Sequence, residues 1–96
     1  MENLVRGLIE KHLDTLLRED LATEAKVLSS LKLSVDSKED YLRGYLVGSL
    51  NGTLTFYLQA LVKRSMTQED VLELYRRVIN GRSSEIEQRI TQVLSK

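Results

Sequence analysis

Apolar residues in the first third of the chain recur at helical spacing. They stand three and four residues apart from Leu4 to Leu17, and the stripe resumes at Leu21, Ala25, Leu28 and Leu31. Such intervals place side chains on one face of an α-helix. The pattern predicts one amphipathic helix over about residues 3–33, bent near Glu19-Asp20, or two helices that break there. We favour the single helix.

The length of this predicted helix has a consequence for packing. At the α-helical rise it would extend about 45 Å, whereas a compact chain of this size has a radius of gyration of about 12–13 Å. Part of the helix would project unless something covered it. A second copy of the chain is the simplest cover.

Three further helices follow from their start and stop signals. Ser37 can cap a helix whose first turn holds Glu39 and Asp40, where carboxylates favour the positive helix end. Thr67 can cap a third, which the Asn80-Gly81 pair is expected to end. The last helix begins with a capping-box pattern formed by two residues, Ser84 and Glu87.

The uncharged stretch over residues 44–62 allows three interpretations. It is long enough to span a membrane, but Asn51, Gln59 and three glycines make it too polar, and we predict no span. Asn51-Gly52 between apolar runs is typical of a β-hairpin turn. A helix fits the period best, since leucines recur every four residues from Leu42 to Leu58. We expect this helix to be surrounded by protein on every side.

The opposite side of that helix carries Gly44, Gly48 and Gly52 together with Asn51 and Gln59. Each glycine costs about 1 kcal/mol relative to alanine inside a helix. Glycines four residues apart make sense where another backbone comes close. The neighbour would be the first helix of the same chain or the same helix of a second copy. In a second copy, Asn51 and Gln59 could hydrogen-bond across and fix the register.

Composition narrows the class of protein. The 96 residues carry 14 basic and 14 acidic side chains, so the overall charge attracts neither nucleic acid nor an anionic membrane. Cysteine is absent, which excludes disulfides and thiolate chemistry, and proline is absent, which leaves long helices unbroken. The N-terminal segment lacks a signal-peptide pattern, and we expect a cytoplasmic protein.

Candidate chemistry is sparse. His12 is the only histidine, and leucine, isoleucine and threonine occupy the positions from which a second metal ligand would come. The pairs Glu19-Asp20, Glu39-Asp40 and Glu69-Asp70 are adjacent on helices, where neighbouring side chains diverge. No nucleophile motif or phosphate loop is present. We predict a partly buried or interfacial histidine, no metal, no cofactor and no enzymatic activity.

A cluster of basic residues suggests an alternative. Residues 67–95 resemble a DNA-binding helix-turn-helix, with "NGRSS" as the turn. Arg77 stands where that motif prefers a small residue, and Glu85, Glu87 and Gln88 stand where bases would be read. A nucleic-acid-binding dimer would use six basic residues, namely Lys63, Arg64, Arg76, Arg77, Arg82 and Arg89, and its binding would weaken steeply with salt.

Together these patterns predict a single all-α domain over residues 1–96, a four-helix bundle-like fold with two long and two short helices. The alternative is an α+β fold with a hairpin around Asn51-Gly52. For function we predict a non-enzymatic helical module for protein–protein interaction or scaffolding. It would self-associate as a homodimer or higher oligomer through the glycine side of its second helix and could bind a further protein partner.

Overall fold

The computed structural model of the chain describes residues 2–57 and 67–95. Its elements, in order, are α1 (Glu2–Thr15), the π-helical turn η1 (Leu16–Asp20), α2 (Leu21–Ser30), α3 (Lys38–Tyr57), α4 (Gln68–Gly81) and α5 (Ser83–Leu94). No strand occurs within these two ranges. The prediction of an all-α, bundle-like fold is therefore confirmed. The α+β alternative is wrong, because Asn51 and Gly52 lie inside α3.

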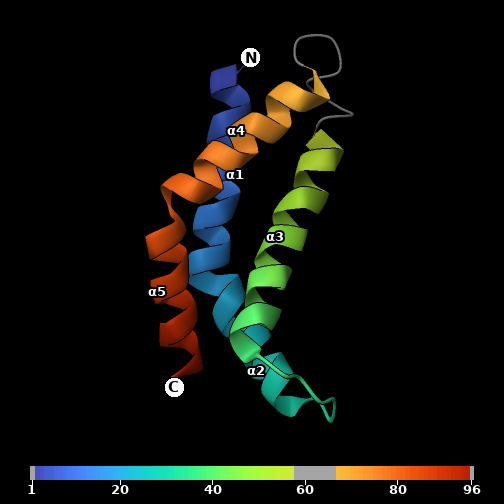
Figure 1. Cartoon of the computed structure of the whole chain (residues 1–96), viewed down its shortest axis with the longest axis vertical. Helices are drawn as coiled ribbons and strands as arrows, with labels where there is room; N and C mark the ends of the chain where they lie inside the picture. The colour runs from blue at the N-terminus through green and yellow to red at the C-terminus, as the bar shows by residue number, and fades with distance from the viewer. Residues whose placement is uncertain (1, 58–66, 96) are drawn as a thin grey trace.

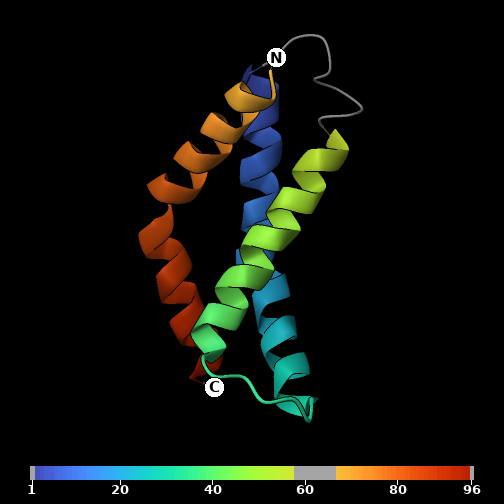
Figure 2. The same ribbon diagram turned by 45° about the vertical axis from the view of Figure 1, so that its right-hand side comes forward.

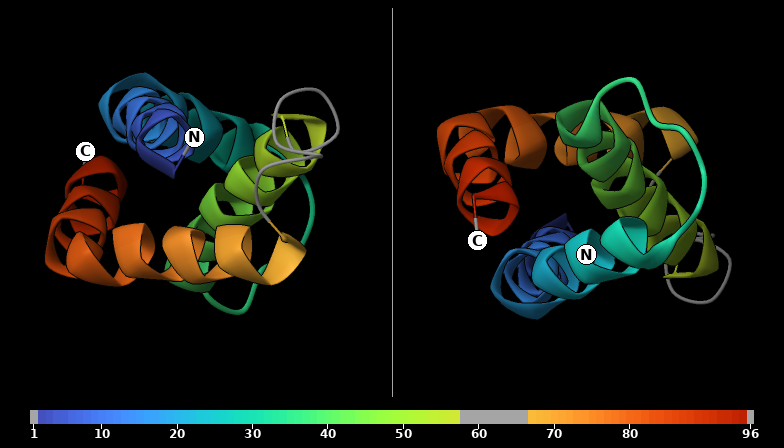
Figure 3. Two further views of the ribbon diagram at one scale, coloured as in Figure 1. Left: turned by 90° about the horizontal axis from the view of Figure 1, so that it is seen from above. Right: turned by 90° about the horizontal axis from the view of Figure 1, so that it is seen from below.

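The helices form three legs of a bundle (Figure 1). α1, η1 and α2 make the first leg, α3 returns along it, and α4 and α5 follow one another down the third leg. The first leg packs against both others: α1 contacts α3 and α4, and α2 contacts α3 and α5 (Figure 2). The two ends of the chain lie at opposite ends of the bundle. Seen along its length, the three legs surround a common core (Figure 3).

The first leg is one continuous helix whose middle turn is wider than the rest. Inside η1 the Leu21 N–H donates to the Leu16 carbonyl, five residues back, where an α-helix would bond four residues back. An extra residue in one turn rotates everything after it by about 100° around the axis. Leu13 before the turn and Leu21 after it are both fully buried. The predicted single helix with a bend near Glu19-Asp20 thus takes the form of a π turn.

Arg89 of α5 reaches across to this π turn. Its Nε donates to the Leu17 carbonyl at 2.6 Å, and its Nη2 donates to the Arg18 carbonyl at 3.4 Å. A wider turn displaces carbonyl oxygens from the regular bonding ladder, and such groups need other partners. A single guanidinium from the third leg thus supplies bonds to two consecutive carbonyls of the first.

The helix boundaries agree with most of the sequence signals. The Ser37 hydroxyl accepts from the Asp40 N–H at 3.1 Å and caps α3. Thr67 and Asp70 form a reciprocal capping box at the start of α4. The first leg ends at Ser30, three residues short of the predicted 33, because the chain turns extended at Leu31.

The junction between α4 and α5 differs from expectation in two ways. α4 does end at Gly81, but no glycine in the described residues has a positive φ, so the stop is not a left-handed glycine cap. The predicted Ser84–Glu87 capping box is wrong, since α5 begins at Ser83 without a side-chain cap. Glu87 instead binds Arg43 on α3. The carboxylate that the predicted capping box would use is therefore part of an ion pair between two helices.

The core runs along the whole first leg. Eight of its apolar side chains are buried, all against the chain's own helices: Val5, Ile9, Leu13, Leu16, Leu17, Leu21, Ala25 and Leu28. The molecule is elongated, with extents of 44 × 24 × 20 Å and a radius of gyration of 14.5 Å. A compact chain would give about 12.5 Å. The other legs extend along the long helix, so its length does not require a second copy as cover.

Replacing Arg89 by alanine should lower the free energy of unfolding by about 1–2 kcal/mol, since hydrogen bonds from a charged donor to the π-turn carbonyls are lost. Urea unfolding followed by circular dichroism measures this. Gln88→Ala is the matched control, because Gln88 is the neighbouring residue and its side chain is exposed. Arg89→Lys should recover only part of the loss, because an ammonium lacks the planar fork. Equal stability of Arg89→Ala and Gln88→Ala would contradict the assigned role.

Candidate interaction surfaces

The outward side of α3 carries five exposed residues without a charge: Gly44, Val47, Gly48, Asn51 and Gly52. We call this set the glycine face. Val47 is 45% exposed, which is high for a valine. A helix face that meets only water usually carries charged side chains. The glycine face is thus unusual for a surface in contact with solvent alone.

The glycines of this face meet nothing within the chain. A Cβ added at Gly44, Gly48 or Gly52 would find no heavy atom within 4 Å, apart from its local helix surroundings. The interpretation that they admit the first helix of the same chain is therefore wrong. So is the expectation of a helix covered on every side. α3 packs on the first leg with its leucine side instead, where Leu42, Leu46 and Leu50 are at most 1% exposed.

Two of the five predicted self-association residues need separate comment. Asn51 is exposed on the glycine face. Gln59 lies outside the described residues. The structure therefore brings four predicted residues, the three glycines and Asn51, onto one exposed face.

An apolar groove adjoins the glycine face on its Val47 side. It has a volume of about 180 Å³ and is walled by Leu46 and Val47 of α3, Ile79 of α4 and Ile86 of α5. Tyr75 of α4 donates its hydroxyl to the Val47 carbonyl at 3.1 Å, which ties α4 to this edge of α3. Burial of the Tyr75 ring raises the pKa of its hydroxyl. The groove extends the uncharged surface from α3 toward the third leg.

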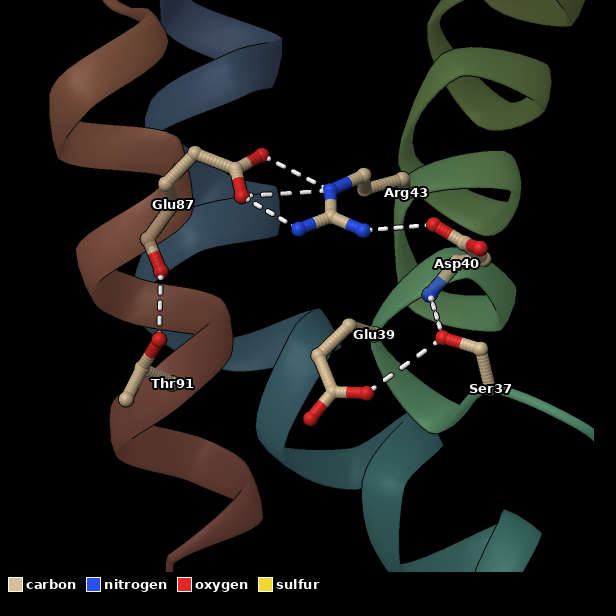
Figure 4. Close-up of polar contacts among 6 residues, drawn as sticks. All are labelled: Ser37, Glu39, Asp40, Arg43, Glu87 and Thr91. Atoms are coloured by element: carbon tan, nitrogen blue, oxygen red, sulfur yellow. Dashed lines mark hydrogen bonds and ion pairs between the residues drawn. The ribbon is translucent and has the colours of Figure 1, made fainter.

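Arg43 is part of the lining of that groove. It joins α3 to α5 by its pair with Glu87 (Figure 4). Its Nε lies 2.9 Å from Oε2 and 3.1 Å from Oε1 of Glu87, and Nη1 binds Asp40. The hydrogen bonds from Arg43 hold the pKa of the Glu87 carboxyl below its usual range. Asp40 also contributes its backbone N–H to the Ser37 cap shown in the same view. The pair therefore links two legs and the start of α3.

Of the four predicted nucleic-acid residues that the structure describes, three are engaged in ion pairs. Arg76 and Arg77 both pair with Glu73, at 3.1 and 3.6 Å. Arg82 bridges Asp14 and Glu85 at 2.6 and 2.9 Å, and its hydrogen bonds lower the pKa of Glu85. Arg89 binds the π turn, as described above. Lys63 and Arg64 lie outside the described residues.

A polar cleft of about 450 Å³ lies between η1 and α5. Charged side chains line it, but most are paired with one another or with backbone: Asp14 and Glu85 with Arg82, and Arg89 with the π-turn carbonyls. These contacts across the cleft therefore hold the first leg and the third leg together. The nucleic-acid alternative stays a prediction, and the geometry gives its arginines structural partners.

His12 is partly buried between the first leg and α3. Its Nε2 lies 3.1 Å from the Thr53 hydroxyl and 3.4 Å from the Ser49 hydroxyl. This agrees with the prediction of a partly buried histidine. Within the described part of the chain, no three metal-ligating side chains come together. No helix in that part is long and apolar enough to cross a bilayer.

Sequence reasoning missed one surface, at the end of the bundle where α2 ends and α3 begins. There an apolar groove lies between α2 and the last turn of α5, with Lys26 and Lys38 at its edge. Its lining combines residues of α2 with Lys38 and with Val93 and Leu94 of α5, which are far apart in the sequence. No local pattern in the sequence indicates that these segments meet.

Comparisons of this chain with protein-family models, with curated proteins and with solved structures find no match.

Replacing Glu87 by glutamine should make the free energy of unfolding depend less on pH in the acid range. Because the folded pKa of Glu87 is lowered, its ion pair contributes above the ordinary glutamate pKa of about 4.3. That contribution is lost as the pH falls through the lowered folded value. Both partners are exposed, so the effect should be small. Urea unfolding from pH 7 to pH 3 measures it.

The control for this titration is Asp36→Asn, which removes a carboxylate that has no ion-pair partner in the described structure. Glu87→Gln should lie below the parent at pH 7 and converge with it in acid. Parallel curves for Glu87→Gln and the parent across the whole range would show that the pair does not stabilise the fold.

Proposed function

We propose that this chain is a non-enzymatic helical interaction module that forms a homodimer through the glycine face of α3. One observation supports it above the others: Gly44, Gly48 and Gly52 lie on an exposed helix face and meet nothing in their own chain. Together they cost about 3 kcal/mol relative to alanine. No internal contact explains that cost, whereas close approach of a second backbone would.

Two copies of α3 crossing at Gly48 would make an isologous interface, in which the same face serves both copies. Without Cβ atoms at the crossing, the two backbones can approach closely and make Cα–H···O contacts. Asn51 lies one turn from Gly48 on the same face, where its amide could hydrogen-bond across the symmetry axis. Such a polar contact would fix the register of the two helices.

The surroundings of the face fit this arrangement. A second helix lying on the glycines would cover the exposed part of Val47 and the mouth of the neighbouring apolar groove. Arg43 and Asp40, the charged residues nearest to that edge, are already paired. The interface would therefore bury apolar and small side chains without stranding an unpaired charge.

The proposal retains two further predictions from the sequence, a cytoplasmic location and a protein partner. The argument from helix length is dropped, because the chain covers its own long helix. The glycine face alone supports self-association.

The substitution Gly48→Ala should change the stability of the single chain and the stability of the dimer in opposite directions. The substitution should raise the helix stability of the single chain by about 1 kcal/mol, since alanine is the better helix former and its methyl group has open space. The same methyl should hold two crossing backbones apart and weaken the dimer. Light scattering over a concentration series measures the mass, and urea unfolding at low concentration measures the stability.

Gly7→Ala is the matched control, because Gly7 is also helical, exposed and open to an added methyl, but lies on α1. It should stabilise the fold and leave the dimer unchanged. Gly48→Glu should give a folded monomer. A parent chain that stays monomeric at all concentrations, or a Gly48→Glu variant that remains dimeric, would refute the glycine interface.

A further inference from the structure

The groove missed by the sequence is lined by residues of α2, α5 and the start of α3. These three elements lie at the end of the bundle where α5 ends (Figure 3, right). The apolar wall of the groove comes from α2 and α5, and its rim holds Lys26 and Lys38. We call it the lysine-rimmed groove. The lining residues are Ala22, Ala25, Lys26, Leu28, Ser29, Lys38, Val93 and Leu94, and the volume is about 220 Å³.

The two lysines of the rim are available. Among the described residues neither Lys26 nor Lys38 makes an ion pair or a side-chain hydrogen bond, and both are exposed. This contrasts with the arginines, which are paired throughout the described part of the fold. Two unpaired cations beside an apolar lining favour an anionic and apolar occupant.

Three carboxylates that lie within two residues of these lysines along the chain have other partners. Glu24 accepts a hydrogen bond from the Tyr41 hydroxyl at 2.7 Å, which raises the pKa of that tyrosine. Glu39 accepts from Ser37, and Asp40 pairs with Arg43. Their carboxylates are therefore engaged with partners other than the lysines.

Exposed apolar side chains also occur near the end of α2. Val27 and Leu31 are each 42% exposed, and Leu33 is 72% exposed. They belong to the same end of the bundle, where α2 stops and the chain turns toward α3 (Figure 1). An apolar groove with a charged rim is typical of a protein-binding surface.

The size of the groove selects among anionic apolar occupants. Pockets for drug-sized ligands measure about 300–1,000 Å³, so a hollow of about 220 Å³ accepts one or two apolar side chains rather than a whole lipid. We infer that the lysine-rimmed groove binds an acidic amphipathic segment of another protein. An apolar anchor would occupy the hollow, and flanking carboxylates would meet Lys26 and Lys38.

This inference goes beyond the proposed dimer and uses other elements. The glycine face lies on the outer side of α3, whereas the groove is formed by α2, α5 and the first residue of α3. Either proposal can fail without the other, because the dimer is tested by the mass of the chain and the groove is tested by the binding of peptides.

The test uses two synthetic helical peptides that share one leucine and phenylalanine stripe and differ only at the flanking positions, glutamate in one and lysine in the other. Fluorescence anisotropy with the full chain measures binding. The glutamate peptide should bind at least about tenfold more tightly, and its advantage should shrink as salt rises. Amide NMR shifts should change most at Ala22, Ala25, Val93 and Leu94.

The double variant Lys26→Glu with Lys38→Glu should reverse the preference of the chain between the two peptides. Lys11→Glu is the control, since Lys11 is exposed, unpaired in the described structure and located on α1. It should keep the original preference. Circular dichroism shows that each variant folds.

Three outcomes would overturn the inference. They are equal binding of both peptides, absence of binding by the glutamate peptide, and shift changes confined to other surfaces. Binding to phosphatidylserine vesicles that Lys26→Glu with Lys38→Glu abolishes, without peptide binding, would assign the groove to a membrane surface instead.

Discussion

The structure depends on keeping one apolar stripe directed at one core along a helix of 29 residues. Six of the buried positions recur every four residues: Val5, Ile9, Leu13, Leu17, Leu21 and Ala25. Because an α-helix has about 3.6 residues per turn, each four-residue step drifts by about 40° around the axis. Over five steps the stripe would leave the core. The π turn at Leu16–Asp20 returns about 100° of this drift, and both halves then face α3, α4 and α5.

Three arginines join the legs of the bundle. Arg43 connects α3 to α5, Arg82 connects the third leg to Asp14 on α1, and Arg89 bonds the carbonyls of the π turn. Each planar guanidinium satisfies several acceptors at once, which suits the joining of helices that cross at an angle. The surfaces left unpaired are therefore of two other kinds: the uncharged glycine face and the lysine-rimmed groove. We propose a second copy of the chain as the occupant of the first and an acidic partner as the occupant of the second.

Local signals in the sequence predicted the positions of the helices well. They predicted the partners of the polar side chains less well. Ser37 and Thr67 cap the helices that they precede, because a cap needs only a hydroxyl and the next few N–H groups. Ser84 and Glu87 form the same pattern, but Glu87 binds Arg43, a partner 44 residues away. A local motif cannot reveal this competition, because Arg43 is far from Glu87 in the sequence. Leu31 was expected in the packed stripe, but α2 ends at Ser30 and the chain turns extended at Leu31.

The sequence by itself determined the helical class, the continuity of the first helix and the grouping of three glycines on one side of α3. These properties follow from side-chain period and from interactions within a few residues. Only the tertiary structure decided which side of α3 the core covers, which carboxylates the arginines bind, and where the four-residue stripe is compensated. Those outcomes depend on the crossing of helices far apart in the chain. The glycine side was left exposed because the leucine side offered the first leg more apolar surface to bury.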